Sequence, residues 1–226
     1  MDAVEAAKIT AAKQSLEFVK DGMTVGLGSG STATHFIKLL GEKVKAGLKI
    51  RSISSSKASE DLARSLSIPI TDFRQAPEID VAIDGADEIG PHLALVKGGG
   101  GALLREKIVA SAAKRFIVVA DSTKIVARLG KFPLPVEVIP MAAPLVEKKI
   151  RELGISSTVR QAKTGGDYIT DEGNLILDCA CGVIQDPDAL AASLRAMVGV
   201  VEHGLFLNMA EMALVAGEAG VKTILR

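Results

Sequence analysis

The chain has 226 residues, of which 27 are lysine or arginine and 27 are aspartate or glutamate, so its formal net charge at pH 7 is zero. This length allows one large domain or two small ones, each with a hydrophobic core. The balanced charge argues against a general electrostatic attraction to nucleic acid. Because 48% of the residues are apolar but only 3% are aromatic, the core must consist mainly of valine, isoleucine, leucine and alanine.

The sequence shows no pattern typical of a membrane span, a secretion signal or a metal centre. The apolar runs are much shorter than a membrane span, and residues 1–5 have neither the basic start nor the apolar block of a secretion signal. Cys179 and Cys181 lie too close together for an ordinary disulfide within one strand, and no other Cys or His stands at zinc-binding spacing. We therefore expect a cytoplasmic protein with reduced thiols, no membrane association and no metal centre.

The first half of the chain alternates between helical segments and short runs rich in valine and isoleucine. We expect helices over 6–19, 33–40, around 62–66 and over 103–113, and strands over 23–27, 50–53, 79–83, 93–96 and 116–120. The strands are apolar on both faces, and polar clusters stand where they end. This pattern predicts an α/β fold with a doubly wound, mainly parallel sheet and a ligand crevice at its carboxyl edge.

The pattern changes at Phe132, where two prolines interrupt the chain. The segments expected next are, in order, a strand over 136–139, a helix over 145–153, a hairpin around the turn 171–174, a helix after Pro187 and a strand near Val200. A β-α-β-β-α-β order of this kind predicts a smaller, ferredoxin-like α+β domain.

Residues 212–215 and 221–225 have the composition of buried strands, and we expect them to return to the first domain. The predicted organisation is a Rossmann-like catalytic domain over 1–131 plus 207–226 and a ferredoxin-like α+β domain over 132–206.

A glycine-rich turn, Gly26-x-Gly28-x-Gly30-Ser31-Thr32, follows the first predicted strand and opens a helix. Backbone amides at a helix start suit a phosphate dianion, although such turns also occur without any ligand. A dinucleotide site would need an acidic residue after the next strand, where this chain has Ser54-Ser55-Ser56. A P-loop would end in Gly-Lys-Ser/Thr, and this turn has no such lysine, which argues against an ATP site. A phosphate monoester fits best, with the three serines as further donors.

Polar residues also follow the later strands. Lys97 precedes four consecutive glycines, and Glu106 lies in the helix after them. An ammonium with bare backbone amides can hold a developing oxyanion, and a carboxylate can move a proton. Asp84 ends an apolar strand and is suited to hydroxyl binding or proton transfer, whereas Glu88 is expected to be a capping or solvated acid. Lys124 follows another strand end.

These candidates have ordinary alternatives. Lys97 and Lys124 are also compatible with surface lysines, and Glu106 with an exposed helix acid near a helix start. Lys8, in the first predicted helix, is a weaker candidate for a phosphate contact.

Five sequence blocks stand out in this order: residues 28–32, 54–56, 84–88, 97–107 and 130–138. Together they resemble the type A ribose-5-phosphate isomerases, and the likeness runs nearly end to end. The resemblance implies interconversion of ribose 5-phosphate and ribulose 5-phosphate through an enediolate, a step of the non-oxidative pentose phosphate pathway. It also implies a reaction without cofactor or metal, and assembly as a homodimer or homotetramer.

The resemblance further implies roles for particular residues. Glu106 would be the base that carries a proton between C2 and C1, with Asp84 and Lys97 as the other catalytic residues. The substrate-binding residues that it implies are Ser29, Gly30, Ser31, Thr32, Asp84, Gly85, Ala86, Asp87, Lys97, Gly98, Gly99, Gly100 and Lys124.

Two other classes of protein use a similar sheet. A phosphosugar-sensing regulator would normally carry a DNA-binding helix-turn-helix segment and positive charge, and neither is found here. An acyl or CoA transferase would use a glutamate nucleophile and need a longer chain for its thioester ligand. Formation of a ketose from ribose 5-phosphate separates these alternatives from an isomerase.

Overall fold

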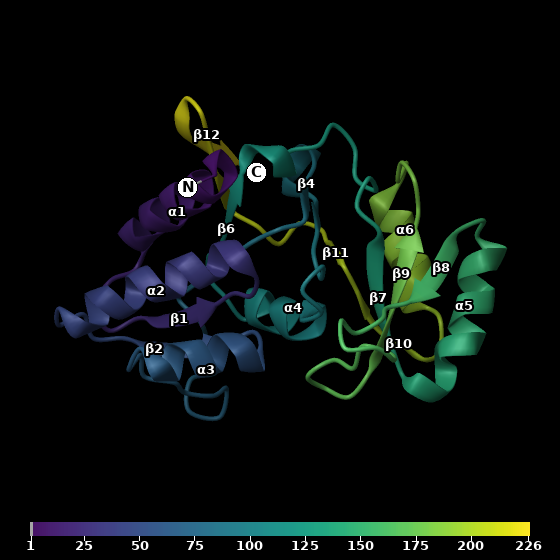
Figure 1. Ribbon diagram of the computed structural model, residues 1–226, viewed down its shortest axis with the longest axis horizontal. Coiled ribbons are helices and arrows are strands. Elements are labelled where there is room, and N and C mark those ends of the chain that lie inside the picture. Colours follow the sequence, from purple (N-terminus) through teal and green to yellow (C-terminus); the bar gives the residue numbers. More distant parts are fainter. Residues whose placement is uncertain (1) are drawn as a thin grey trace.

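The computed structural model describes residues 2–226 and contains a large and a small sheet, each covered by helices (Figure 1). The large sheet has six strands in the order β13-β12-β6-β3-β1-β2. They are β1 (Thr24–Leu27), β2 (Arg51–Ser54), β3 (Val81–Asp84), β6 (Phe116–Asp121), β12 (Met212–Gly217) and β13 (Gly220–Leu225). All neighbouring pairs are parallel except β12 and β13.

Helices cover both faces of this sheet. The helices are α1 (Ala3–Ser15), α2 (Ser31–Lys45), α3 (Lys57–Ser65) and α4 (Leu103–Ser111). Because successive side chains of a strand point to opposite faces, Val81 and Ile83 of β3 join the core formed with α1, α2 and α3, whereas Ala82 packs in the core that contains α4. The predicted doubly wound, mainly parallel sheet is confirmed.

The small sheet is antiparallel and has the order β10-β7-β9-β8. Its strands are β7 (Leu134–Val138), β8 (Ser156–Val159), β9 (Leu175–Ala180) and β10 (Val200–His203), and its helices are α5 (Ala143–Glu152) and α6 (Pro187–Arg195). These elements enclose a core of their own and follow one another as β-α-β-β-α-β. The predicted α+β arrangement is therefore confirmed, while the domain boundaries at 131/132 and 206/207 stay a prediction.

A third, three-stranded sheet was not predicted. It consists of β4 (Glu88–Ile89), β5 (Leu95–Val96) and β11 (Leu205–Phe206), so it joins segments far apart in the sequence. The expected strand over 93–96 is wrong at its start, because His92 and Leu93 both have a φ of 55°. These residues lie in the short 3-10 helix η2 (Pro91–Leu93). Other short 3-10 helices in the described part of the chain are η1 (Leu16–Phe18), η3 (Ser122–Lys124) and η4 (Pro140–Ala142).

Residues 221–225 form the expected strand and return to the large sheet, as residues 212–215 do, but the expectation that this strand is buried is wrong. This segment is β13, whose residues are mostly exposed because it forms the edge of the large sheet. Within residues 2–226, no helix is both long enough and apolar enough to span a bilayer.

Candidate active site

A cavity of about 110 Å³ lies where loops follow the carboxyl ends of β1 and β3. Its lining consists of Lys8, Ser29, Gly30, Ser31, Thr32, Gly85, Ala86, Asp87, Lys97, Gly98, Gly99, Gly100, Glu106 and Lys124. Every predicted site residue except Asp84 belongs to this lining, and Asp84 contacts it from within the protein. The structure thus brings the predicted residues together, while their individual roles stay predictions.

One end of the cavity is the N-terminus of α2. Gly30 caps this helix with a φ of 88°, which favours glycine, and none of the described side chains accepts a hydrogen bond from the helix start. The first amides of a helix have no partner inside the helix and carry its positive dipole end. The N-terminus of α2 can therefore receive an anionic group, and Lys8 and Lys124 add positive charge to the same cavity.

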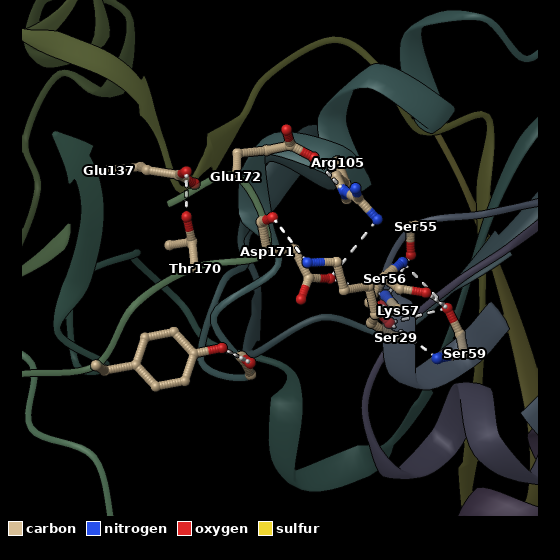
Figure 2. Close-up of polar contacts among 12 residues, drawn as sticks. Ser29, Ser55, Ser56, Lys57, Ser59, Arg105, Glu137, Thr170, Asp171 and Glu172 are labelled. Carbon is tan, nitrogen blue, oxygen red and sulfur yellow. Dashed lines mark hydrogen bonds and ion pairs between the residues drawn. The ribbon is translucent and has the colours of Figure 1, made fainter. Parts of the chain in front are cut away.

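Ser29 is held in place by two serines that follow β2 (Figure 2). Its hydroxyl lies 2.8 Å from the hydroxyls of Ser55 and of Ser56, and Ser56 also caps α3 by accepting a hydrogen bond from the amide of Ser59. The expectation that Ser54, Ser55 and Ser56 would donate to a phosphate is not supported, because none of them lines the described cavity. Ser55 and Ser56 instead support the loop that does.

Asp84 is 4% exposed and organises the floor of the site. Its Oδ1 accepts hydrogen bonds from the amides of Ser29 (2.9 Å) and Gly85 (2.7 Å), while its Oδ2 lies 3.1 Å from Nζ of Lys97. A Cβ at Gly28 would lie 2.3 Å from Asp84 Oδ1. Glycine at position 28 therefore lets the backbone approach the carboxylate closely enough for these bonds to form.

Lys97 and Glu106 form a buried charged pair beside Asp84. Lys97 is 2% exposed, and its ammonium donates to the carbonyl of Gly85 at 2.6 Å and lies 3.5 Å from Oε2 of Glu106. Burial opposes the charge on Lys97, but the two carboxylates outweigh this effect and raise its pKa. Lys97 is therefore a fixed cation in the wall of the cavity.

Glu106 is 5% exposed and lies in the first turn of α4. Burial raises its pKa to about 8, against the opposing effect of Lys97. Among the described residues, its Oε2 has no hydrogen-bond donor. A buried carboxylate on a residue that lines a cavity, with one oxygen free to accept a proton, is equipped to act as a base toward a bound molecule.

The glycine loop after Lys97 lies between Asp87 and α4. Gly98 has a φ of 101°, and a Cβ at Gly99 would lie 2.6 Å from Asp87 Oδ1, whose partner Oδ2 accepts the amide of Gly99 at 2.8 Å. Gly100 differs, since no heavy atom of the described neighbours lies within 4 Å of a Cβ built there. The protein itself thus requires glycine at 98 and 99, whereas Gly100 leaves open space at the cavity.

The expected role of Glu88 is wrong. Glu88 is 2% exposed, and its carboxylate accepts hydrogen bonds from the backbone amides of Gly130 (2.7 Å) and Phe132 (2.6 Å). This residue is neither a helix cap nor a solvated acid. It joins β4 to the connection that leads into the small sheet.

Residues of the small sheet and of the segment between β8 and β9 also surround the site, and they were not predicted. Arg160 donates to the carbonyls of Gly98 and Gly99, and the hydroxyl of Tyr168 donates to that of Gly100. Glu137, in β7, is buried, and the backbone of Leu104 in α4 opposes the rise of its pKa on burial. No local pattern in the sequence marks these residues, because their partners lie more than thirty positions away.

Residues 51–220 match the family described as ribose 5-phosphate isomerase A (phosphoriboisomerase A). The chain belongs to this family. Among ribose-5-phosphate isomerase A relatives, it is 49% identical over 223 residues to that of Parvibaculum lavamentivorans, covering 96% of both chains. It is 50% identical over 230 residues to that of Bradyrhizobium diazoefficiens, covering 97% of this chain and 95% of the relative.

Solved structures of ribose-5-phosphate isomerases share the whole fold. One, determined in complex with phospho-erythronic acid, has a TM-score of 0.96 and 41% identity, with full coverage of both chains. Ribose 5-phosphate isomerase A of Methanocaldococcus jannaschii has a TM-score of 0.94 and 40% identity, covering 98% of this chain and 99% of its own. Within residues 2–226, no group of three or more His, Cys, Asp or Glu side chains could hold a metal ion.

Proposed function

We propose that this chain interconverts ribose 5-phosphate and ribulose 5-phosphate, with Glu106 as the group that moves the proton. Membership in the ribose 5-phosphate isomerase A family supports the reaction, and a relative solved with phospho-erythronic acid supports a site for a phosphorylated sugar acid. The observation that supports the role of Glu106 best is that this buried residue lines the cavity and that one of its carboxylate oxygens, Oε2, accepts no hydrogen bond from the described residues.

The phosphate would bind at the start of α2. The amides after Gly30 supply hydrogen-bond donors and Lys124 and Lys8 supply positive charge. Fixing the phosphate at one end of a small cavity orients the rest of the sugar, so that C1 and C2 are already placed beside the catalytic groups when the substrate is bound. Asp87, which lines the cavity, and Asp84, which lies directly beneath the lining, would accept hydrogen bonds from sugar hydroxyls and assist ring opening.

Isomerisation then needs removal of a proton from carbon. The Glu106 carboxylate takes the proton from C2 of the open-chain aldose, and the C–H electron pair forms a C1=C2 double bond. The carbonyl oxygen at C1 becomes the alkoxide of an enediolate, which the ammonium of Lys97 stabilises. A proton moves from O2 to O1, and Glu106 returns its proton to C1, which leaves the ketone at C2. Atoms and charge balance without any other reactant.

Lys97 is suited to the oxyanion role because its position is fixed before the reaction. Its ammonium donates to Gly85 O and lies 3.1 Å from Asp84 Oδ2 and 3.5 Å from Glu106 Oε2, so that its charge is held at the wall of the cavity beside the proposed base. A donor already in place costs no reorganisation when charge develops, and one such donor contributes about 3–4 kcal/mol.

The direct test of this proposal is an assay for ketose formation. Purified protein is incubated with ribose 5-phosphate, and ribulose 5-phosphate is detected by its absorbance or by NMR. We expect the same equilibrium ratio of the two sugars to be approached from either substrate. Failure to convert either one, by protein shown to be folded by circular dichroism, would refute the isomerase assignment.

The pH dependence of kcat/KM should report the ionisation of Glu106. Since burial raises the pKa of this group to about 8, much of it is protonated in the free enzyme at neutral pH and cannot act as a base. We expect kcat/KM to rise as the pH increases through about 8 and then to level off. Initial rates at low substrate over about pH 6 to 10 check this. A profile that is flat across that range would contradict a titrating Glu106.

We also propose that the protein is cytoplasmic and assembles as a homodimer or homotetramer, as its resemblance to the family implies. The exposed apolar residues Met141 (92% exposed) and Val198 (79% exposed) are consistent with a surface that a second copy would cover. Light scattering after gel filtration measures the number of subunits.

A further inference from the structure

The segment between β8 and β9, residues 160–174, extends from the small sheet to the site on the large one. Its first contact is with the glycine loop. Nη1 of Arg160 donates to the carbonyls of Gly98 (2.8 Å) and Gly99 (3.2 Å), and the same guanidinium is fixed by a salt bridge to Asp178 of β9. Residues of the small sheet therefore hold the backbone of a loop that lines the cavity.

The second contact is with the two residues that precede Glu106. The backbone of Leu104 interacts with the carboxylate of Glu137 and opposes the rise of its pKa on burial. Glu137 also accepts hydrogen bonds from Thr170 Oγ1 and Asn174 Nδ2, at 2.9 Å each. Arg105 pairs through Nε with Glu172, and its Nη1 lies 3.7 Å from Oδ2 of Asp171 (Figure 2). The first turn of α4 is thus held from the small sheet at both positions before the proposed base.

The third contact is with the N-terminus of α3. Oδ2 of Asp171 accepts the backbone amide of Lys57 at 2.7 Å, and Nζ of Lys57 donates to the carbonyl of Asp171 at 3.2 Å. Lys57 is the first residue of α3, directly after Ser56, whose hydroxyl bonds to that of Ser29. A carboxylate at a helix N-terminus is favoured by the helix dipole.

One carboxylate oxygen, Oδ2 of Asp171, therefore faces both sides of the site. It is bonded to the helix start that supports Ser29, and it is paired with the arginine next to Glu106 (Figure 2). Ser29 and Glu106 line the same cavity from these two sides. Asp171 itself lies outside the lining and can act only through the residues that it holds.

We propose that Asp171 is a positioning residue for the isomerisation, which fixes the placement of Glu106 relative to the Ser29 loop by joining the first turns of α3 and α4. This inference rests on the proposed function. The physical reason is that proton transfer from carbon depends steeply on the placement of the base, and a misplacement of about 1 Å can cost about 10²-fold in rate. The small sheet thereby acts in catalysis without supplying a group to the cavity.

The kinetic test compares three variants. Asp171→Ala removes the link between α3 and α4, and we expect kcat to fall by about 10- to 100-fold while KM changes by less than about threefold. Asp171→Asn keeps an oxygen that can accept a hydrogen bond from the Lys57 amide but loses the charge that faces Arg105. The decrease in kcat should therefore be smaller than in Asp171→Ala. Asp167→Ala is the matched control, because Asp167 lies in the same segment and its carboxylate bonds to Gln161.

The control should keep its kcat within about twofold of the parent protein. Three results would overturn the proposal: an unchanged kcat in Asp171→Ala, an increase in KM with no change in kcat, or an equal loss of kcat in Asp167→Ala. If Asp171→Ala does not fold, as judged by circular dichroism, the same criteria apply to Asp171→Asn.

A double-mutant cycle tests whether Asp171 acts through α4. Arg105→Ala should also lower kcat, and the Asp171→Ala/Arg105→Ala double variant should be no worse than the more affected single variant, because both changes break one connection. Losses of kcat that multiply would show two independent effects and would refute this coupling.

Hydrogen exchange separates a failure of this inference from a failure of the proposed function. In Asp171→Ala, backbone amides in the first turns of α3 and α4 should exchange faster than in the parent protein, with no change in Asp167→Ala. This measurement needs no substrate. If the parent protein makes no ketose, the isomerase assignment fails but exchange still tests the link, whereas unchanged exchange in an active enzyme refutes the link alone.

Discussion

Glu106→Gln is expected to lower kcat by about 10²- to 10⁴-fold while KM changes by less than about threefold. The amide has nearly the shape of the protonated acid, so the cavity and its contacts with a bound sugar stay intact, but it cannot accept a proton from carbon. Steady-state kinetics with ribose 5-phosphate at about pH 9, where the parent carboxylate is ionised, give the largest difference.

The matched control is Glu147→Gln, the same chemical change at a partly exposed position of α5, where Glu147 pairs with Arg151. It should leave kcat and KM unaltered. A kcat for Glu106→Gln close to that of the parent would remove this residue from the mechanism. Because burial raises the pKa of Glu106 to about 8, its ionisation costs free energy of folding, and we therefore also expect the neutral variant to unfold no more easily than the parent above pH 8.

Lys97→Ala is expected to lower kcat by about 10²- to 10³-fold, and to lower it more than it raises KM. The ammonium lies beside two carboxylates in the wall of the cavity, so its loss removes the cation that faces the developing oxyanion. It also removes the effect that keeps the pKa of Glu106 from rising further. The rise of kcat/KM with pH should therefore move to higher pH in this variant.

Stability must be measured alongside these rates, since removal of one partner from a buried ion pair costs about 3–5 kcal/mol. Lys97→Met, which keeps most of the side-chain volume, separates the charge from the packing. Lys107→Met is the control. Lys107 is also buried and pairs with Glu202, and its Nζ lies 4.8 Å from the centre of the Phe206 ring, over which Nζ of Lys97 also lies, at 5.4 Å. An effect of Lys97→Ala on KM alone would make Lys97 a binding residue.

The large sheet and most of the cavity could be predicted from the sequence because their signals are local. One buried strand ends at Asp84, and another ends just before Gly28 and the helix that follows. In each case one short segment of sequence predicts both the strand and the functional residue at its end. Parallel strands then bring such segments to one edge without further information. The prediction that Lys97 and Glu106 share a site follows in the same way, because a short glycine loop joins them.

The contacts that could not be predicted join residues far apart in the chain. The three-stranded sheet pairs Leu205 with Val96, and two-residue strands have no period to detect. Glu88 looked like a solvated acid because its donors are backbone amides at positions 130 and 132, which any residue type could supply. Asp171 reads as a turn residue and serves as one, and nothing nearby in the sequence reveals its bond to Lys57.

The position of β12 in the large sheet has a consequence for how the protein is made. β12 lies between β6 and β13, so residues 212–225 supply an interior strand of a sheet whose other strands precede residue 122. A ribosome releases the whole small sheet before that strand, and domains generally fold as units during synthesis. We therefore expect the nascent chain to complete the core of the small sheet before that of the large sheet. Until β12 is made, the edge of β6 with which β12 pairs stays exposed. This interval is the one in which a chaperone would be needed.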